Sequence, residues 1–210
     1  MFIVFEGIDG TGKTTQVNLL ARALSGRGLP VLVTREPGGT AAAEAIRRLL
    51  LDPAGESLEP LTEVLLYAAA RAQHVARKIR PALAAGRVVL CDRFADATLA
   101  YQGFGRGLEI GALAGLNALA AGGLVPALTF LLDMPPAEAL ARLKRPADRM
   151  EREGIEFYRQ VRRGYLELAA REPGRYRVID ARPAAGTVHG LVLAAVEEML
   201  HETVCRFSRA

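Results

Sequence analysis

Residues 7–14 read GIDGTGKT and fit the pattern G-x-x-x-x-G-K-[ST]. The β-rich run 2–7 leads into them, and 14–28, with apolar residues at helical spacing, follows. Glycines let such a loop curl so that its N–H groups point at a phosphate; Lys13 would reach further phosphate oxygens, and the Thr14 hydroxyl would bind Mg²⁺. The motif therefore predicts a phosphate-binding loop. The residues expected to surround the phosphates are Gly7, Ile8, Asp9, Gly10, Thr11, Gly12, Lys13, Thr14 and Thr15.

Three charged residues extend this site. Asp92 ends the apolar run VVLCD, where a rigid strand would deliver one carboxylate to the metal side of the loop. Arg93 follows and would face the same crevice. Asp9 lies inside the loop, where a carboxylate repels phosphates unless it has a specific partner. That partner is a sugar hydroxyl or an arginine that also touches phosphate, and the alternative is that Asp9 only forms a turn.

The elements that must position these residues alternate along the chain. Strands separated by helices pair in parallel, which predicts an α/β fold: a doubly wound, five-stranded parallel sheet flanked by helices, as in P-loop NTPases. Ligands bind beyond the carboxyl ends of such strands. Residues 1–210 form one predicted domain with a loose tail at about 203–210. The predicted strands are 2–7, 30–37, 87–93, 127–133 and 175–181, and the predicted helices are 14–28, 41–51, 60–85 and 187–202, with another opened by Pro135 and Pro136.

Composition narrows the classes of function. Half of the 210 residues are hydrophobic, but no apolar run approaches the roughly 18 residues of a membrane span, and the N-terminus does not resemble a signal peptide. Cys91 and Cys205 are expected to be reduced thiols. The formal charge of +4 comes mainly from scattered arginines, with no basic arm for nucleic acid. We therefore expect a cytoplasmic protein with neither a nucleic acid nor a membrane partner.

Motifs beyond the phosphate loop separate the P-loop classes. The chain lacks the NKxD of GTPases and the HRD segment of protein kinases. Its other motifs resemble those of the thymidylate kinases, in family order from about residue 2 to 182. The stretches that carry this resemblance are FEGIDGTGKTT (5–15), TREPGGT (34–40), LLYAAAR (65–71), DRFADATLAYQG (92–103), FLLDMPP (130–136) and ARLKRPADRMEREG (141–154). The resemblance implies ATP-dependent phosphorylation of dTMP, with Mg²⁺, by a homodimer; segment 108–121 would be an interface helix or core.

The resemblance also implies roles in a substrate pocket. Tyr67 would stack on thymine, and Arg71, one helical turn away, would donate to a base carbonyl. Thr98 would face the base N3, and the ring of Tyr101 would lie against the sugar and exclude a 2′-hydroxyl. Asp9 would hold the 3′-hydroxyl or an arginine. The residues implied to clamp the acceptor phosphate are Arg93 and the turn of Arg35, Glu36 and Pro37, and Gln102 would add a hydrogen bond.

Residues 141–154 would form a short lid. Because the phosphate loop has no arginine, the chain resembles members whose catalytic arginine lies in the lid. Arg142, Lys144, Arg145 and Arg149 are the candidates: Arg149 is the first choice to reach the transferring phosphoryl group, Arg145 the second, and Arg142 would lie on adenine. The backbone near 181–183 would border adenine.

A phosphate acceptor is already ionised at neutral pH, so no general base is needed. This agrees with the absence of histidine from the motifs; His74, His189 and His201 are expected to be surface or packing residues. Charge neutralisation would come from Lys13, Mg²⁺, Arg93 and a lid arginine. Two alternatives remain: a nucleoside kinase using Asp9 or Glu36 as base, and a slow P-loop regulator that binds nucleotide or nucleic acid, favoured by the basic pI.

Overall fold

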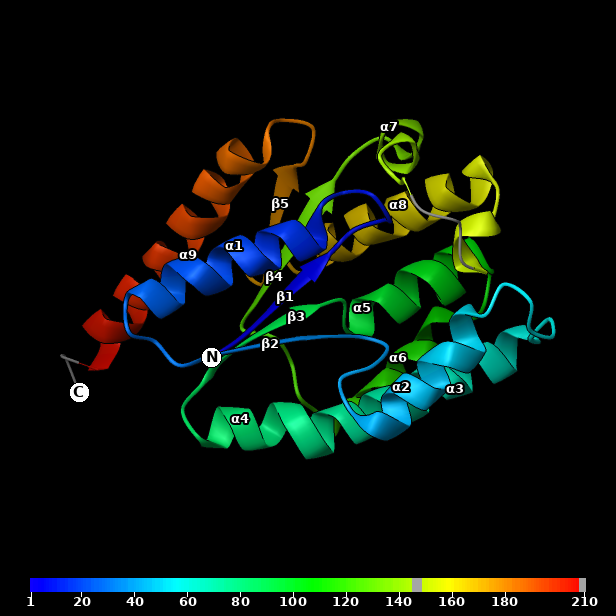
Figure 1. The fold of residues 1–210 in the computed structure, drawn as a ribbon, viewed down its shortest axis with the longest axis horizontal. Helices are drawn as coiled ribbons and strands as arrows, with labels where there is room; N and C mark the ends of the chain where they lie inside the picture. Colours follow the sequence, from blue (N-terminus) through cyan, green and yellow to red (C-terminus); the bar gives the residue numbers. More distant parts are fainter. Residues whose placement is uncertain (145–148, 208–210) are drawn as a thin grey trace.

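The computed structural model describes residues 1–144 and 149–207. Within them, five parallel strands form one sheet in the order β2-β3-β1-β4-β5 (Figure 1). The doubly wound parallel sheet predicted from the sequence is therefore confirmed, with strand ends within two residues of those predicted. The strands are β1 (Phe2–Glu6), β2 (Val31–Arg35), β3 (Val88–Asp92), β4 (Leu128–Asp133) and β5 (Tyr176–Asp180).

Helical segments follow each of these strands. The α-helices are α1 (Lys13–Gly26), α2 (Ala41–Leu51), α3 (Pro60–His74), α4 (Arg80–Ala84), α5 (Ala95–Thr98), α6 (Ile110–Ala121), α7 (Pro136–Ala141), α8 (Ile155–Arg171) and α9 (Ala185–Phe207). Two π-helical segments, η1 (Val75–Ile79) and η2 (Leu99–Gly105), and a 3₁₀ turn, η3 (Met150–Arg152), interrupt or join them.

Alternation of side chains along β1 explains why both faces of the sheet are covered. Ile3 and Phe5 belong to the core cluster that includes α1 and α9, whereas Phe2 and Val4 pack with the apolar residues of η1. Figure 1 shows α1 and α9 side by side, and the two helices are in contact. A strand buried on both faces reads as a continuous apolar run, as FIVF does.

Three segments differ from the sequence-based prediction. The predicted helix 60–85 is divided into α3, η1 and α4, because the turn widens after His74. Helix α9 continues to Phe207, so the backbone of 203–207 is helical where a loose tail was expected. Helix α8 was not assigned from the sequence, although its aromatic residues complete the site. In the described parts of the chain, no helix is long and apolar enough to cross a bilayer.

Candidate active site

The phosphate loop lies between β1 and α1. Gly7, Gly10 and Gly12 have φ angles of 135°, 84° and 90°, in the region that L side chains rarely adopt. A Cβ on Gly10 would lie 1.9 Å from the carbonyl oxygen of Ala139, so this loop also needs glycine to pass beneath α7. Lys13 Nζ donates to the carbonyl oxygen of Ile8 at 2.8 Å, which holds the ammonium over the loop. The predicted strand–loop–helix arrangement is present.

The metal side of the loop joins two segments distant in sequence. Asp92 is the last residue of β3, which pairs with β1. The Thr14 hydroxyl donates to Asp92 Oδ2 at 2.5 Å. A hydroxyl and a carboxylate are oxygen ligands of the kind that Mg²⁺ prefers, and they lie beside the phosphate loop, so the donor set fits the predicted ion.

Arg93 and Asp9 form a partly buried ion pair at the centre of the site. Arg93 has a φ of 71°, uncommon for a residue with a side chain, and its guanidinium turns back toward the loop. Nη2 donates to Asp9 Oδ1 at 2.7 Å and to the Tyr101 hydroxyl at 3.0 Å, while Nη1 donates to the carbonyl oxygen of Gly7 at 3.0 Å. Tyr101 in turn donates to Asp9 Oδ2 at 2.8 Å. Of the partners considered for Asp9, the structure shows an arginine.

Electrostatics keep this pair ionised. Burial by itself raises the pKa of Asp9, but the charges of Arg93 and Lys13, together with hydrogen bonds from Tyr101 and Arg93, outweigh burial and lower the pKa well below its usual value. Burial, followed by the charge of Arg93, lowers the pKa of Lys13 to about 8, against opposing attraction from Asp9, Asp92 and Glu6. A polyanionic ligand would restore the positive form of Lys13, because an adjacent negative charge favours the protonated amine.

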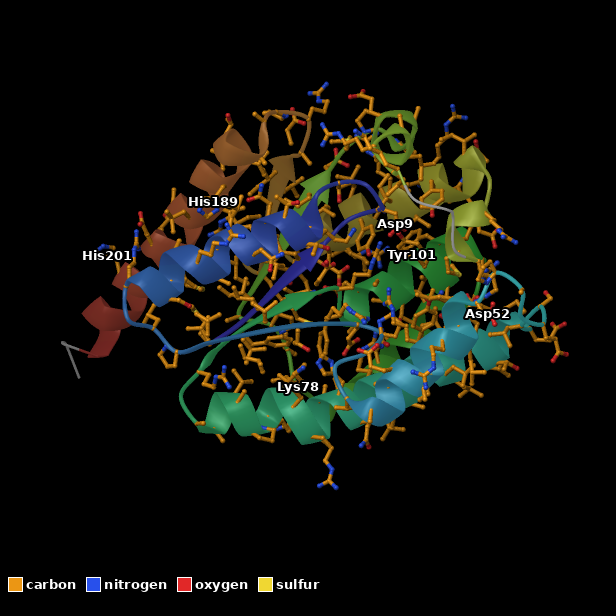
Figure 2. All side chains as sticks on the ribbon, in the orientation of Figure 1. Asp9, Asp52, Lys78, Tyr101, His189 and His201 are labelled. Atoms are coloured by element: carbon orange, nitrogen blue, oxygen red, sulfur yellow. The ribbon has the colours of Figure 1, made fainter. Side chains whose placement is uncertain are left out.

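A hollow of about 610 Å³, counted out to open solvent, extends from Asp9 away from the metal side. It holds most of the residues that the resemblance placed around the substrate. Figure 2 shows Asp9 and Tyr101 close together, and both residues line this hollow. The lining residues that were predicted are Asp9, Glu36, Pro37, Tyr67, Arg71, Arg93, Thr98, Tyr101 and Gln102, and those that were not are Arg47, Leu51, Phe94, Ala97 and Met150.

Arg71 is fixed at the far end of the hollow and is only 2 % exposed. Its Nε donates to Glu36 Oε2 at 2.8 Å, and Nη2 donates to the Thr98 hydroxyl at 3.1 Å. Nη1 donates to Asn117 Oδ1 on α6 at 2.5 Å. The structure therefore brings the predicted base-reading pair, Arg71 and Thr98, into contact. Asn117 had no signal in the sequence, since its role depends on where α6 packs.

Arg35 lies elsewhere than expected. Its guanidinium donates to Glu44 Oε2 at 2.9 Å and to the carbonyl oxygen of Pro37 at 2.7 Å. Among the residues described, Arg35 lines a second hollow, shared with Thr14 and Asp92, rather than the substrate hollow. Arg47 on α2 donates to the same carbonyl oxygen at 3.1 Å and does line the substrate hollow.

The lid candidates separate into two groups. Arg142 Nη1 and Nη2 donate to the carbonyl oxygens of Ala181 and Arg182, each at 3.0 Å, which joins Arg142 to the loop expected at adenine. Arg149 donates to the carbonyl oxygen of Leu50 at 2.8 Å and pairs with Glu63 on α3. The structure thus places the first-choice catalytic arginine on a buried carboxylate and not on the phosphate loop.

Arg145 lies outside the described residues, and Lys144 is exposed. Glu63 is fully buried, and it also accepts from Gln102 Nε2 at 2.9 Å and Arg106 Nε at 2.8 Å. Gln102, expected to bind substrate, thus donates its amide hydrogen bond to Glu63 and also lines the hollow. Through Arg149, this cluster ties the later part of the predicted lid to α3.

The histidines differ from one another. His189 and His201 lie on α9, well away from Asp9 and Tyr101 in Figure 2. His74 is fully buried, which agrees with a packing residue and not a surface one, and both of its ring nitrogens have polar partners. No sequence pattern indicated those partners, because they come from β2 and the turn after it.

Comparison with known proteins agrees with this geometry. The family model for thymidylate kinase matches residues 5–192. A thymidylate kinase of Pelotomaculum thermopropionicum is 58% identical, over 100% of this chain and 98% of its own, and one of Desulforudis audaxviator is 55% identical, over 96% and 92%. The crystal structure of thymidylate kinase from Ehrlichia chaffeensis has a TM-score of 0.78 at 38% identity, covering 94% of this chain and 98% of that one. The chain belongs to the thymidylate kinase family.

Proposed function

We propose that this kinase phosphorylates dTMP to dTDP with ATP, and that the phosphate loop and the adjoining hollow together carry out the reaction. The observation that carries the proposal is the Arg93–Asp9 pair, which lies between the loop on one side and the Arg71–Thr98 pair on the other. A nucleoside monophosphate with its base at Arg71 would present its phosphate to Arg93, next to the site for the ATP phosphates.

The acceptor oxygen needs no base, because a phosphate monoester is ionised at neutral pH. The chain must instead bring two polyanions together and neutralise them. Lys13 binds the donor phosphates, and Arg93, held by Asp9, Gly7, Tyr101 and the Tyr165 hydroxyl, faces both donor and acceptor. Asp9 balances Arg93 and, with Tyr101, fixes the direction of its guanidinium, so that the positive charge is oriented before substrate arrives.

Thr14 and Asp92 would hold Mg²⁺. A hydroxyl and a carboxylate leave room for further oxygen ligands around such an ion. The ion would supply positive charge that neutralises the phosphate groups.

The base end of the hollow suits thymine. Tyr67 supplies a partly exposed aromatic ring beside Arg71, and the buried Thr98 hydroxyl lies next to the guanidinium. A guanidinium donates to a carbonyl oxygen such as O4 of thymine and cannot accept from the amino group of cytosine or adenine. Tyr101, packed against Phe157 and Tyr158, sets the wall facing the sugar.

Arg142, on the 181–182 backbone, would lie on adenine. The guanidinium of Arg149 is paired with Glu63. We therefore assign the contact with the transferring phosphoryl group to Arg145, which was the second choice after Arg149. Closure of the lid would then bring in this charge and exclude water.

Exposed leucines on neighbouring helices support a homodimer. α3 is in contact with both α2 and α6. Leu49 on α2, Leu65 on α3 and Leu119 on α6 are 62%, 50% and 80% exposed. Several large apolar side chains on adjacent helices mark an interaction surface. The predicted interface helix 108–121 includes α6. The expected cytoplasmic location stays a prediction.

The test is a coupled assay of ADP release with ATP, Mg²⁺ and each nucleoside monophosphate in turn, with thymidine as a further acceptor. We expect rapid turnover with dTMP, slower turnover with dUMP, and negligible turnover with AMP or CMP. Turnover of thymidine in place of dTMP would establish the nucleoside kinase alternative instead. Equal rates with all monophosphates would contradict the assignment of Tyr67, Arg71 and Thr98 to the base.

A further inference from the structure

The ring of His74 lies between the side chains of Thr34, in β2, and Glu36, in the turn after β2. Its Nδ1 is 3.1 Å from Glu36 Oε1, and its Nε2 is 2.7 Å from the Thr34 hydroxyl. A carboxylate only accepts hydrogen bonds, so Nδ1 carries a hydrogen and donates to Glu36. His74 itself is fully buried and is not one of the residues found to line the hollow. It can therefore act on substrate only through another residue.

Glu36 divides its two oxygens between two residues of α3. Oε2 accepts from Arg71 Nε at 2.8 Å, while Oε1 accepts from His74. Arg71 and His74 are three residues apart, so they share one face of the helix. The side chains of Glu36 and Arg71 are 5% and 2% exposed. A buried carboxylate held at one oxygen could still rotate about its last bond, whereas one held at both oxygens cannot, and Arg71 is fixed with it.

The same ring also supports the turn that carries Glu36. Gly39, with φ 88°, approaches so closely that a Cβ there would lie 2.5 Å from His74 Cδ2. Thr34, at the end of β2, is bonded to Nε2. His74 thus contacts Thr34 of β2 before Glu36, Gly39 in the turn after it, and Glu36 itself. His74 is the last residue of α3, immediately before the π-helical η1.

We infer that His74 is a positioning residue for the base-reading guanidinium: by holding Glu36 Oε1, it fixes the carboxylate that orients Arg71. The inference rests on the proposed role of Arg71 toward thymine. It assigns His74 no contact with substrate and no proton transfer. Loss of the Nδ1 contact should therefore weaken dTMP binding and leave the ATP side unchanged.

Two substitutions separate the two ring nitrogens. In His74→Asn, the side-chain amide nitrogen occupies the position of Nδ1, so the contact with Glu36 can persist and that with Thr34 is lost. In His74→Gln, the terminal amide lies near Nε2, so the contact with Thr34 can persist and that with Glu36 is lost. We expect His74→Gln to raise KM for dTMP about tenfold, and His74→Asn to stay within about threefold of the unchanged protein. KM for ATP should change less than twofold in both variants.

A role in packing alone predicts the opposite order. Glutamine is closer in volume to histidine than asparagine is, so a packing role would make His74→Asn the more damaged variant. Thermal unfolding of both variants records that packing loss separately from KM. Thr34→Val, which removes only the Nε2 partner, should lower stability without raising KM for dTMP. If His74→Gln does not fold, the folded His74→Asn variant still decides the matter, because a tenfold rise in its KM for dTMP would overturn the inference.

Arg71→Lys distinguishes this inference from the proposed function. If Arg71→Lys raises KM for dTMP while His74→Gln matches the unchanged protein, the inference is wrong and the proposed pocket stands. If Arg71→Lys leaves KM for dTMP unchanged, the assignment of Arg71 to the base is wrong and the inference falls with it.

Discussion

Arg93 Nη2 donates to Asp9 Oδ1 at 2.7 Å and so joins two segments that are 84 residues apart in the sequence. Asp9 lies in the phosphate loop, and Arg93 directly follows Asp92, the carboxylate on the metal side. The donor site, the metal side and the substrate hollow therefore meet at one ion pair. The same guanidinium lies 4.8 Å from the centre of the Tyr101 ring, which adds a cation–π contact.

Replacement of Asp9 should disable this arrangement. In Asp9→Asn, Arg93 keeps its shape but loses its counter-charge; breaking a fully buried pair costs about 3–5 kcal/mol, and breaking this partly buried pair should cost less. We expect kcat/KM for dTMP to fall on the order of 100-fold, measured by steady-state kinetics. Asp180→Asn, at the last residue of β5 with a side chain that is 47% exposed, is the control and should stay near the unchanged protein. A similar rate for Asp9→Asn would contradict the assigned role.

The metal side can be tested by titration with Mg²⁺. Thr14→Ala removes one of the two oxygens that lie 2.5 Å apart, and Asp92→Asn replaces the charged carboxylate that carries the other by a neutral amide. Both should raise the Mg²⁺ concentration required for half-maximal rate, Asp92→Asn by roughly tenfold or more, because the lost ligand carries a full charge. Ser25→Ala, at an exposed position near the end of α1, serves as the control. An unchanged Mg²⁺ requirement in both site variants would place the ion elsewhere.

Local patterns were sufficient to predict the sheet and the phosphate loop. Apolar runs that end in polar residues mark parallel strands, and the glycine spacing of 7–12 allows few backbone paths. β3 could also be predicted to deliver Asp92 to the loop, since parallel strands end on the same edge. In each case the information lies within a few neighbouring residues.

The side-chain partners could not be predicted, because they depend on how distant elements pack. Arg149 and Arg145 look alike in the sequence, but only the fold brings Glu63 of α3 to Arg149. Arg35 resembles a phosphate clamp, yet Glu44, nine residues later, is close enough to pair with it. His74 carried no signal for the same reason, since its partners come from β2 and the turn after it.

The two lid arginines should have separable effects. Arg145→Ala removes the charge that we assign to the transferring phosphoryl group, so kcat should fall on the order of 10³-fold with little change in KM. Arg149→Ala leaves Glu63 with Arg106 and Gln102, so the melting temperature should fall by several degrees while kcat stays within about tenfold. Arg159→Ala, on the exposed face of α8, is the matched control. The reverse pattern would return the catalytic role to Arg149.

The leucines on α2, α3 and α6 predict the oligomeric state. Leu119→Glu places a charge on an 80% exposed side chain of α6, and in a dimer interface that charge would be buried without a partner. We expect Leu119→Glu to shift the protein from dimer to monomer in sedimentation velocity at micromolar concentration. Leu191→Glu, at a 54% exposed leucine of α9, should not. A monomeric unchanged protein would contradict the proposed dimer.

Glu6 makes the stability of the protein depend on pH. It is fully buried beneath Arg93, where it accepts from the Phe94 N–H at 2.7 Å and from the Tyr165 hydroxyl at 2.8 Å. Burial, followed by the charge of Asp96, raises the pKa of Glu6 to about 8. The charge of Arg93 and the hydrogen bonds that Glu6 accepts from Tyr165 and Phe94 oppose this rise. Between its unfolded value of 4.5 and about 8, the folded protein therefore holds a proton that the unfolded chain lacks.

Raising the pH through that range must remove stability, since the folded state binds more protons than the unfolded state there. Glu6→Gln abolishes this titration. The difference in melting temperature, Glu6→Gln minus the unchanged protein, should therefore increase by roughly 5 °C or more from pH 5.5 to pH 8.5, measured by calorimetry. Glu156→Gln, at an exposed position of α8, should follow the unchanged protein at both pH values. Parallel pH profiles for Glu6→Gln and the unchanged protein would show that Glu6 titrates near its ordinary pKa, because only a shifted group contributes to the slope.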